Sequence, residues 1–133
     1  MKFMLDTNIL IYLIKRKPGR VLQRFAAHSM TDVCVSSISI AELEFGVMKS
    51  GSQRNTQTLD GWLQLLQRPA FDDAAARSYG IIRAELESIG TPIGPLDTLI
   101  AAHAIALKAT LVTNNTGEFA RVPGLQIEDW TQP

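Results

Sequence analysis

The chain has 133 residues, and its 13 basic and 13 acidic side chains leave no formal net charge. This balance excludes a protein that coats nucleic acid through bulk positive charge, and a content of 46% hydrophobic and 20% charged residues excludes extensive disorder. The lone cysteine, Cys34, has no partner for an internal disulfide, and no leader or membrane-spanning run is visible, so we expect a cytoplasmic protein of one domain, residues 1–133.

Taken in chain order, the hydrophobic pattern predicts short apolar strands that alternate with helices. The first half predicts strands at 2–5 and 33–37 and helices at 9–14, 21–27, 39–49 and 59–66. The second half predicts helices at 72–88 and 97–108, a rigid turn at 91–95, and strands at 110–113 and 125–127. Such alternation is typical of parallel sheets, so we predict an α/β fold in which helices flank both faces of a mainly parallel sheet, an α/β/α arrangement.

Three acidic residues stand where a predicted strand or turn gives way to a helix: Asp6, Glu42 and Asp97. In a parallel sheet such junctions gather at the carboxyl edge of the strands, where ligands bind. Carboxylates that meet there repel one another, and a hard dication such as Mg²⁺ or Mn²⁺ removes the conflict. The set therefore suits metal-assisted hydrolysis of a phosphodiester.

Each acid also has a purely structural interpretation. Acids near helix N-termini are stabilised by the helix dipole alone. Ser39 and Glu42 have the spacing of a capping box, and Asp97 has the position of a simple N-cap.

Four segments, in this order and spacing, carry a family resemblance. They are Met4–Asn8, Ser36–Leu43, Pro92–Ala104 and Leu111–Phe119. Over nearly its whole length the chain resembles the PIN-domain ribonucleases, and most closely the VapC toxins of VapBC toxin–antitoxin pairs. This resemblance implies a single PIN-like domain in which Asp6, Glu42 and Asp97 are the catalytic, metal-binding acids.

The resemblance has one departure. The family often has a fourth acid two residues after the threonine that corresponds to Thr113, and here that residue is Asn115. An amide oxygen still accepts a hydrogen bond but adds no charge. Glu118 is near in sequence and either compensates or is a surface residue before Phe119. The residues expected to surround the metal ligands are Thr7, Asn8, Thr113, Asn115 and Glu118.

Other polar residues are weighed in the same way. The densest basic cluster is Lys15, Arg16, Lys17 and Arg20, followed by Arg24; it is either a site for RNA phosphates or a solvated loop. His103 shares a helix stripe with Leu99 and Ile100, which indicates a core histidine more than a general base. Trp62 and the leucines around it indicate core, or a groove that accepts a partner helix.

The resemblance extends to function. It implies a toxin that cleaves RNA with Mg²⁺ or Mn²⁺, is neutralised by a cognate VapB-type antitoxin, and forms a homodimer when free. The stretch Thr113–Thr116 and the tail Glu128–Trp130 are similar to the enteric-type branch, which implies that the substrate is transfer RNA, cut in the anticodon stem-loop of the initiator. Other branches cleave other RNAs, so messenger or ribosomal RNA is the alternative substrate.

Two further readings are compared with this one. A haloacid-dehalogenase-like phosphatase would need a second acid two residues after Asp6, where Asn8 stands. A non-catalytic binding module that keeps the fold would lack one or more of the three acids, all of which are present.

Overall fold

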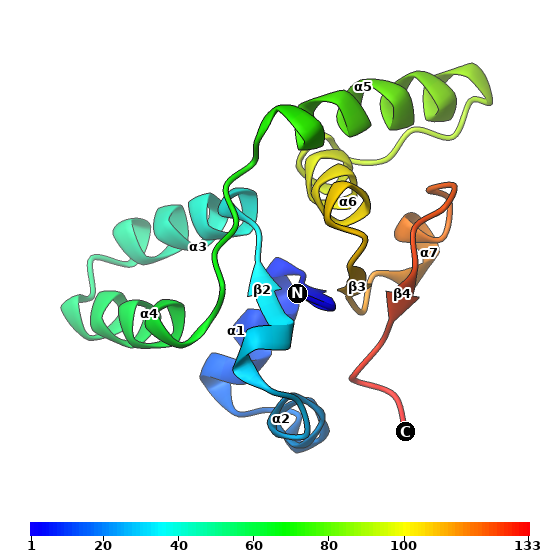
Figure 1. Ribbon diagram of the computed structural model, residues 1–133. Coiled ribbons are helices and arrows are strands. Elements are labelled where there is room, and N and C mark those ends of the chain that lie inside the picture. The colour runs from blue at the N-terminus through cyan, green and yellow to red at the C-terminus, as the bar shows by residue number, and fades with distance from the viewer.

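The computed structural model describes all 133 residues, and its centre is a four-stranded sheet in the order β2-β1-β3-β4 (Figure 1). The strands are β1 (Phe3–Leu5), β2 (Val33–Val35), β3 (Thr110–Val112) and β4 (Ile127–Glu128). All three pairings are parallel, and Met4 in β1 lies opposite Cys34 and Leu111. The predicted parallel sheet is confirmed.

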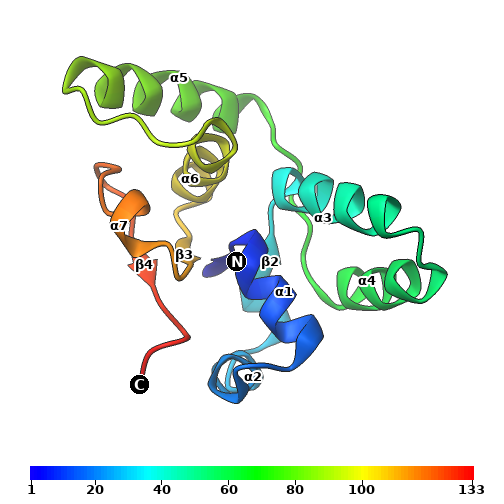
Figure 2. The same cartoon turned by 180° about the vertical axis from the view of Figure 1, so that it is seen from behind.

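Seven α-helices surround the sheet. They are α1 (Thr7–Lys15), α2 (Gly19–Ala26), α3 (Ser37–Ser50), α4 (Gln53–Leu65), α5 (Asp73–Ser88), α6 (Pro95–Leu107) and α7 (Thr116–Phe119), with a short 3-10 turn at Met30–Asp32. Figures 1 and 2 show α1–α4 on one side of the sheet and α5 and α6 on the other. The predicted α/β/α arrangement is therefore confirmed.

Alternation along the short strands builds a separate core on each face of the sheet. Leu5 and its strand neighbours Val35 and Val112 pack against α1–α4. Met4 packs with Cys34, Leu111 and the buried residues of α5, α6 and α7. All of β2 and the last two residues of β1 and of β3 are buried, which explains why these strands are apolar runs.

Several predicted boundaries need correction because helix caps replace expected strand or loop residues. Ser36 and Ser52 accept hydrogen bonds from backbone N–H groups, so α3 begins at Ser37, and α4 begins at Gln53 within the expected loop. The four-residue helix α7 was not expected from the sequence. By contrast, α5 agrees closely with the helix predicted at 72–88: Asp72 caps it, and Gly90 follows it with a left-handed φ of 72°.

No helix of the structure is both long enough and apolar enough to span a lipid bilayer.

Candidate active site

Asp6 is held at the carboxyl edge of the sheet by two hydrogen bonds. It directly follows β1, caps α1, and is 5% exposed. Its Oδ1 accepts from the backbone N–H of Thr7 and its Oδ2 from Thr113 Oγ1, both at 2.8 Å. Thr113 follows the adjacent strand β3, and its Oγ1 in turn accepts from the N–H of Asn115 at 3.0 Å. The Asp6 carboxylate is therefore fixed in orientation, and each oxygen keeps a free lone pair.

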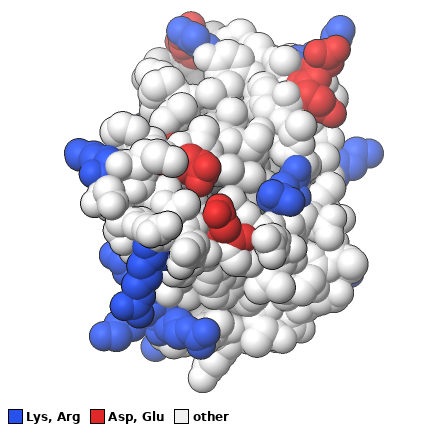
Figure 3. Space-filling model, turned by 90° about the vertical axis from the view of Figure 1, so that its left-hand side faces the viewer, with Lys and Arg blue, Asp and Glu red and all other residues white.

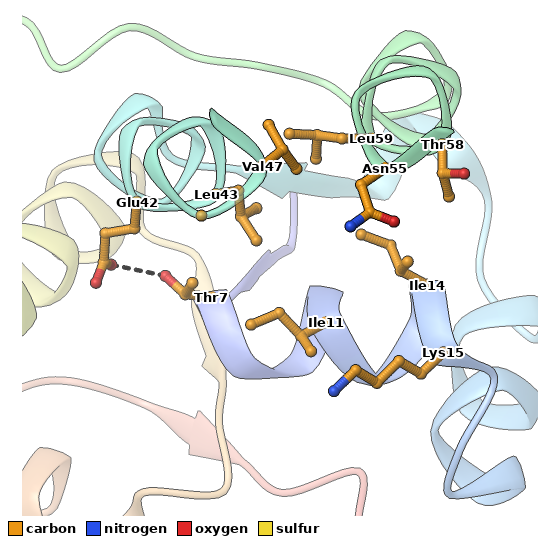
Figure 4. Close-up of a pocket in the computed structure, with 11 residues that line it drawn as sticks. Thr7, Ile11, Ile14, Lys15, Glu42, Leu43, Val47, Asn55, Thr58 and Leu59 are labelled. Atoms are coloured by element: carbon orange, nitrogen blue, oxygen red, sulfur yellow. Dashed lines mark hydrogen bonds between the residues drawn. The ribbon is translucent and has the colours of Figure 1, made fainter. Parts of the chain in front are cut away.

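Glu42 projects from α3 toward the start of α1, as Figure 4 shows. Thr7 Oγ1 donates a 2.8 Å hydrogen bond to its Oε1, so Thr7 contacts both Asp6 and Glu42. The capping-box interpretation of Glu42 is wrong. Ser36 caps α3 by accepting from the N–H of Ile38, and Ser39 lies inside the helix with its buried hydroxyl unpaired.

Asp97 and Glu118 approach each other at the start of α6. This helix has Gly94 as its N-cap and Pro95 as its first residue, so Asp97 lies in the first turn and is not the cap. Glu118 accepts 2.6 Å hydrogen bonds from the Gly94 N–H on Oε1 and from Asn115 Nδ2 on Oε2. A Cβ at Gly94 would lie 3.4 Å from Glu118 Oε1 and 3.6 Å from Asp97 Oδ2, which places both carboxylates beside the same glycine.

The acids perturb one another electrostatically. Burial raises the pKa of Asp97 to about 7, together with repulsion from Glu118, Asp6 and Glu42. Burial also raises the pKa of Asp6, although its hydrogen bonds from Thr113 and Thr7 oppose the rise. The pKa of Glu118 is lowered, chiefly by its bond from the Gly94 N–H. Without a cation, the site therefore keeps Glu118 ionised and holds a proton on part of the Asp97 population.

These residues fit a hard divalent cation by their chemistry. Asp6, Glu42, Asp97 and Glu118 offer only oxygen donors, and their mutual repulsion is a charge excess that a cation would relieve. As they lie, no three acidic, histidine or cysteine side chains converge closely enough to hold one ion. Mg²⁺ commonly takes only one or two carboxylates and keeps several waters, so this wide set is compatible with it.

The remaining predicted residues divide into two groups. Thr7, Thr113, Asn115 and Glu118 lie within the hydrogen-bond network around the acids, whereas Asn8 is exposed on α1. Gly94 was missed by the sequence reasoning, although its place just before Pro95 at a helix start is the signal of a free N–H. Tyr12 was also missed; its hydroxyl accepts from Asn114 Nδ2 at 2.9 Å.

The basic cluster is exposed and lies around the end of α1. Lys15, Arg16 and Lys17 form no ion pair, while Arg20 donates to the carbonyl of Thr131 at 3.2 Å. Arg24 is paired with Glu128 at 3.3 Å. Figure 3 views the side of α3 and α4 and shows separate acidic and basic patches, not a continuous basic face. On this face any attraction for phosphates is therefore local.

A groove of about 390 Å³ lies between α1, α3 and α4, next to the acids (Figure 4). Its apolar wall is formed by five side chains, Ile11, Ile14, Leu43, Val47 and Leu59. Thr7 and Glu42 line the groove as well, and so does Lys15. Trp62 does not line it; this side chain is half-buried and packs against Phe25, 5.7 Å between ring centroids, so the core interpretation holds for it.

Acids at the carboxyl edge of a four-stranded parallel sheet covered by helices are the features of one domain class, and residues 3–125 match the family model described as the PIN domain. The chain belongs to the PIN-domain family and, within it, to the VapC ribonucleases. It is 45% identical over 131 residues to the "tRNA(fMet)-specific endonuclease VapC" of Salmonella typhimurium, covering 98% of each chain. It is 43% identical over 132 residues to "Ribonuclease VapC2" of Rickettsia felis, again covering 98% of each.

Solved structures give the same result. The DNA-bound VapBC of Salmonella typhimurium contains a chain with a TM-score of 0.90 and 44% identity, covering 98% of both chains. VapBC2 of Rickettsia felis, bound to a fragment of its promoter DNA, gives a TM-score of 0.87 and 41% identity over 98% of this chain and 99% of that one. The overall backbone of the present protein is therefore that of the VapC subunits in these complexes.

Proposed function

We propose that this protein is the toxin of a VapBC-type pair and that it cleaves RNA endonucleolytically with Mg²⁺ or Mn²⁺ at Asp6, Glu42 and Asp97. The observation that supports this most is the gathering of Asp6, Glu42 and Asp97 at one edge of the sheet, where burial and the neighbouring carboxylates raise the pKa of Asp97. Perturbed acids gathered at one edge of a sheet favour a functional site over structural helix capping.

The division of roles follows from the hydrogen bonds. Asp6, fixed by Thr7 and Thr113, and Asp97 would hold the cation. When bound, a divalent cation offsets phosphate charge and makes water more acidic. Glu42 is oriented through Oε1 by Thr7, which leaves Oε2 to hold the cation or to accept a proton from the attacking water. Glu118, anchored on the N–H of Gly94, supplies the fourth negative charge that Asn115 does not.

We further propose that the substrate is transfer RNA, cut once in the anticodon stem-loop. Initiator transfer RNA is the leading candidate. Relatives at 45% and 46% identity are named for tRNA(fMet). The absence of net charge disfavours indiscriminate RNA binding, and unpaired loops present bases that a protein can read. Messenger or ribosomal RNA is the alternative.

Control of such a toxin would come from a VapB-type antitoxin acting in the same cytoplasmic compartment. The apolar groove beside Glu42 suits one amphipathic segment of that partner, and Lys15 at its edge suits an acidic residue on it. The free toxin would form a homodimer through exposed apolar positions such as Phe45 and Met48 on α3, which are 68% and 70% exposed.

One assay tests the catalytic proposal. Purified protein is incubated with RNA in Mg²⁺, Mn²⁺ or EDTA, beside Asp6→Ala and Asp97→Ala, with Asp60→Ala on the exposed face of α4 as the control. We expect cleavage when Mg²⁺ or Mn²⁺ is present and none in EDTA. Among the proteins, the wild type and the Asp60→Ala control should cleave, and the two site variants should not. Full cleavage in EDTA or in either site variant would contradict the proposed metal site. No cleavage by the wild type under any of these conditions would favour a non-catalytic binding module.

The substrate and partner are tested in cells. New RNA 5′ ends are sequenced after brief induction, with Asp6→Ala as the blank. We expect ends concentrated in one anticodon loop; ends scattered over messenger RNAs, with intact transfer RNA, would show a different substrate. Co-expression with the adjacent upstream gene should yield a stable complex and restore growth, and no complex would argue against the pairing.

A further inference from the structure

A buried hydrogen bond joins the helix that carries Asp97 to the helix that carries Glu42. His103 Nδ1, on α6, lies 2.8 Å from the hydroxyl of Ser36, the N-cap of α3. Both side chains are inaccessible, with His103 1% exposed and Ser36 0% exposed. No other side-chain hydrogen bond connects these two helices. Glu42 and Asp97, the acids that these helices carry, repel each other electrostatically and share no hydrogen bond.

One direction of this contact fits the second hydrogen bond that Ser36 makes. Ser36 Oγ already accepts from the N–H of Ile38 at 3.0 Å, so its own proton is available for the Nδ1 atom of His103. In this arrangement His103 is neutral with its proton on Nε2, an atom that is buried and makes no hydrogen bond of standard geometry. Burial lowers the pKa of His103, and Asp72 and the Ala70 carbonyl oppose this only in part, which agrees with a neutral acceptor.

A second set of contacts holds the start of α3 in place. Ser37 Oγ accepts a 3.1 Å hydrogen bond from the backbone N–H of Phe71, and the Phe71 ring meets the His103 ring edge-on, 5.4 Å between centroids. The start of α3 is thereby held by α6 and by the segment between α4 and α5. Because α3 is a rigid helix, its orientation at Ser36 sets where Glu42 lies relative to Asp97.

We propose that His103 is a positioning residue for the acidic site, and that its bond to Ser36 sets the spacing between Glu42 and Asp97. The inference rests on the metal site of the proposed function, and its activity readout rests on the proposed RNA cleavage as well. An apolar side chain of similar size would fill the same volume. The imidazole in addition favours the one packing of α3 against α6 in which it forms a hydrogen bond with the Ser36 hydroxyl.

The test compares His103→Leu, which fills the space without accepting a hydrogen bond, with His103→Asn, whose amide oxygen stands near the position of Nδ1. Mn²⁺ affinity is measured by calorimetry, and kcat and KM are measured on RNA. We expect His103→Leu to lose roughly 10-fold or more in Mn²⁺ affinity and in kcat, as when residues that orient metal ligands are removed. KM should change little, and His103→Asn should recover most of the loss.

Two controls separate positioning from stability. Val21→Ala removes buried volume from α2, which carries none of the acids, so it should lower the melting temperature and leave Mn²⁺ affinity unchanged. Ser36→Ala should reproduce the loss seen in His103→Leu, and the double variant should be no worse than either single one.

The outcomes are distinct. Folded His103→Leu with wild-type Mn²⁺ affinity and kcat overturns the inference, as does a double variant whose losses multiply. A wild type that binds Mn²⁺ but cleaves no RNA contradicts the proposed function, and the calorimetry then decides the role of His103 alone.

Discussion

The pKa of Asp97 is raised to about 7 by burial and by the neighbouring carboxylates. In the unfolded chain the same group ionises at its ordinary value of 3.8. Between these values the folded protein binds more protons than the unfolded chain, so stability falls as the pH rises from about 4 to about 7. The acidic site thus costs stability at neutral pH when no cation is bound.

This cost predicts that Asp97→Asn stabilises the metal-free protein. In EDTA at about pH 8, its melting temperature should exceed that of the wild type because one of the repelling charges is gone. The advantage should shrink as the pH falls and disappear below about pH 4, where the wild-type carboxyl is protonated as well. Thermal melts over this pH range, with Asp60→Asn as the exposed control, measure it; a constant difference at all pH values would contradict the electrostatic origin.

Asn115 offers a second test at the residue scale. Its amide donates to Glu118 Oε2 at 2.6 Å, so Asn115→Asp replaces a hydrogen bond with a repulsive pair. We expect a lower melting temperature in EDTA and tighter Mn²⁺ binding, because the new carboxylate adds charge beside the acids. Melts and calorimetry on both forms decide this. Unchanged or weaker Mn²⁺ binding would place Asn115 outside the reach of the metal.

Among the elements, the short strand β4 depends on the aromatic residue that follows it. Trp130 is fully buried, stacks on His28 at 5.3 Å between ring centroids, and contacts Phe3 of β1 at 5.7 Å. Its Nε1 donates to Glu128 at 3.1 Å, and Glu128 also pairs with Arg24 of α2. The C-terminal segment is therefore attached both to the sheet and to the helices.

Removing this ring should destabilise the whole domain. We expect Trp130→Ala to cost about 3–5 kcal/mol of unfolding free energy, the range for deleting a buried aromatic side chain. Trp62→Ala is the matched control: that tryptophan is only half-buried, so its loss should be smaller. Urea unfolding of both variants measures the difference. Equal losses would mean that β4 is not anchored by Trp130.

At the scale of the whole molecule, the zero net charge limits how steeply the RNA-binding constant falls as the salt concentration rises. Only the cluster Lys15, Arg16, Lys17 and Arg20 offers several cations together near the groove. With four phosphate contacts at most, the logarithm of the binding constant should fall against the logarithm of salt with a slope no steeper than about −3.

The triple variant Lys15→Ala/Arg16→Ala/Lys17→Ala should make that slope shallower by about 2. Arg83→Ala, on α5 and paired with Glu87, is the control and should leave it unchanged. Binding of the catalytically silent Asp6→Ala form, measured between about 50 and 200 mM salt, gives the slopes. An unchanged slope in the triple variant would show that this cluster is a solvated loop.

The features that the sequence by itself determined are those with a signal within one helix, strand or turn. Apolar strands alternating with helices are readable because each element must bury one or both faces, and this periodicity predicted the parallel sheet and its two helical layers. Asp6 and Asp97 were predictable because each stands at the end of a strand or turn, where the chain order alone places it at the carboxyl edge. The helix stripe likewise predicted His103 as a core residue, and it is buried.

The tertiary structure alone decided which of these residues touch. Thr7 meets Glu42 across 35 positions, Glu118 meets Gly94 across 24, and His103 meets Ser36 across 67. None of these pairs has a local periodic signal, because each depends on how whole helices dock on the sheet. The tertiary structure also decided the cap at Ser36 and the four-residue helix α7. Only a few hydrogen bonds form each of them, so local conformations of similar free energy compete and the surrounding packing decides between them.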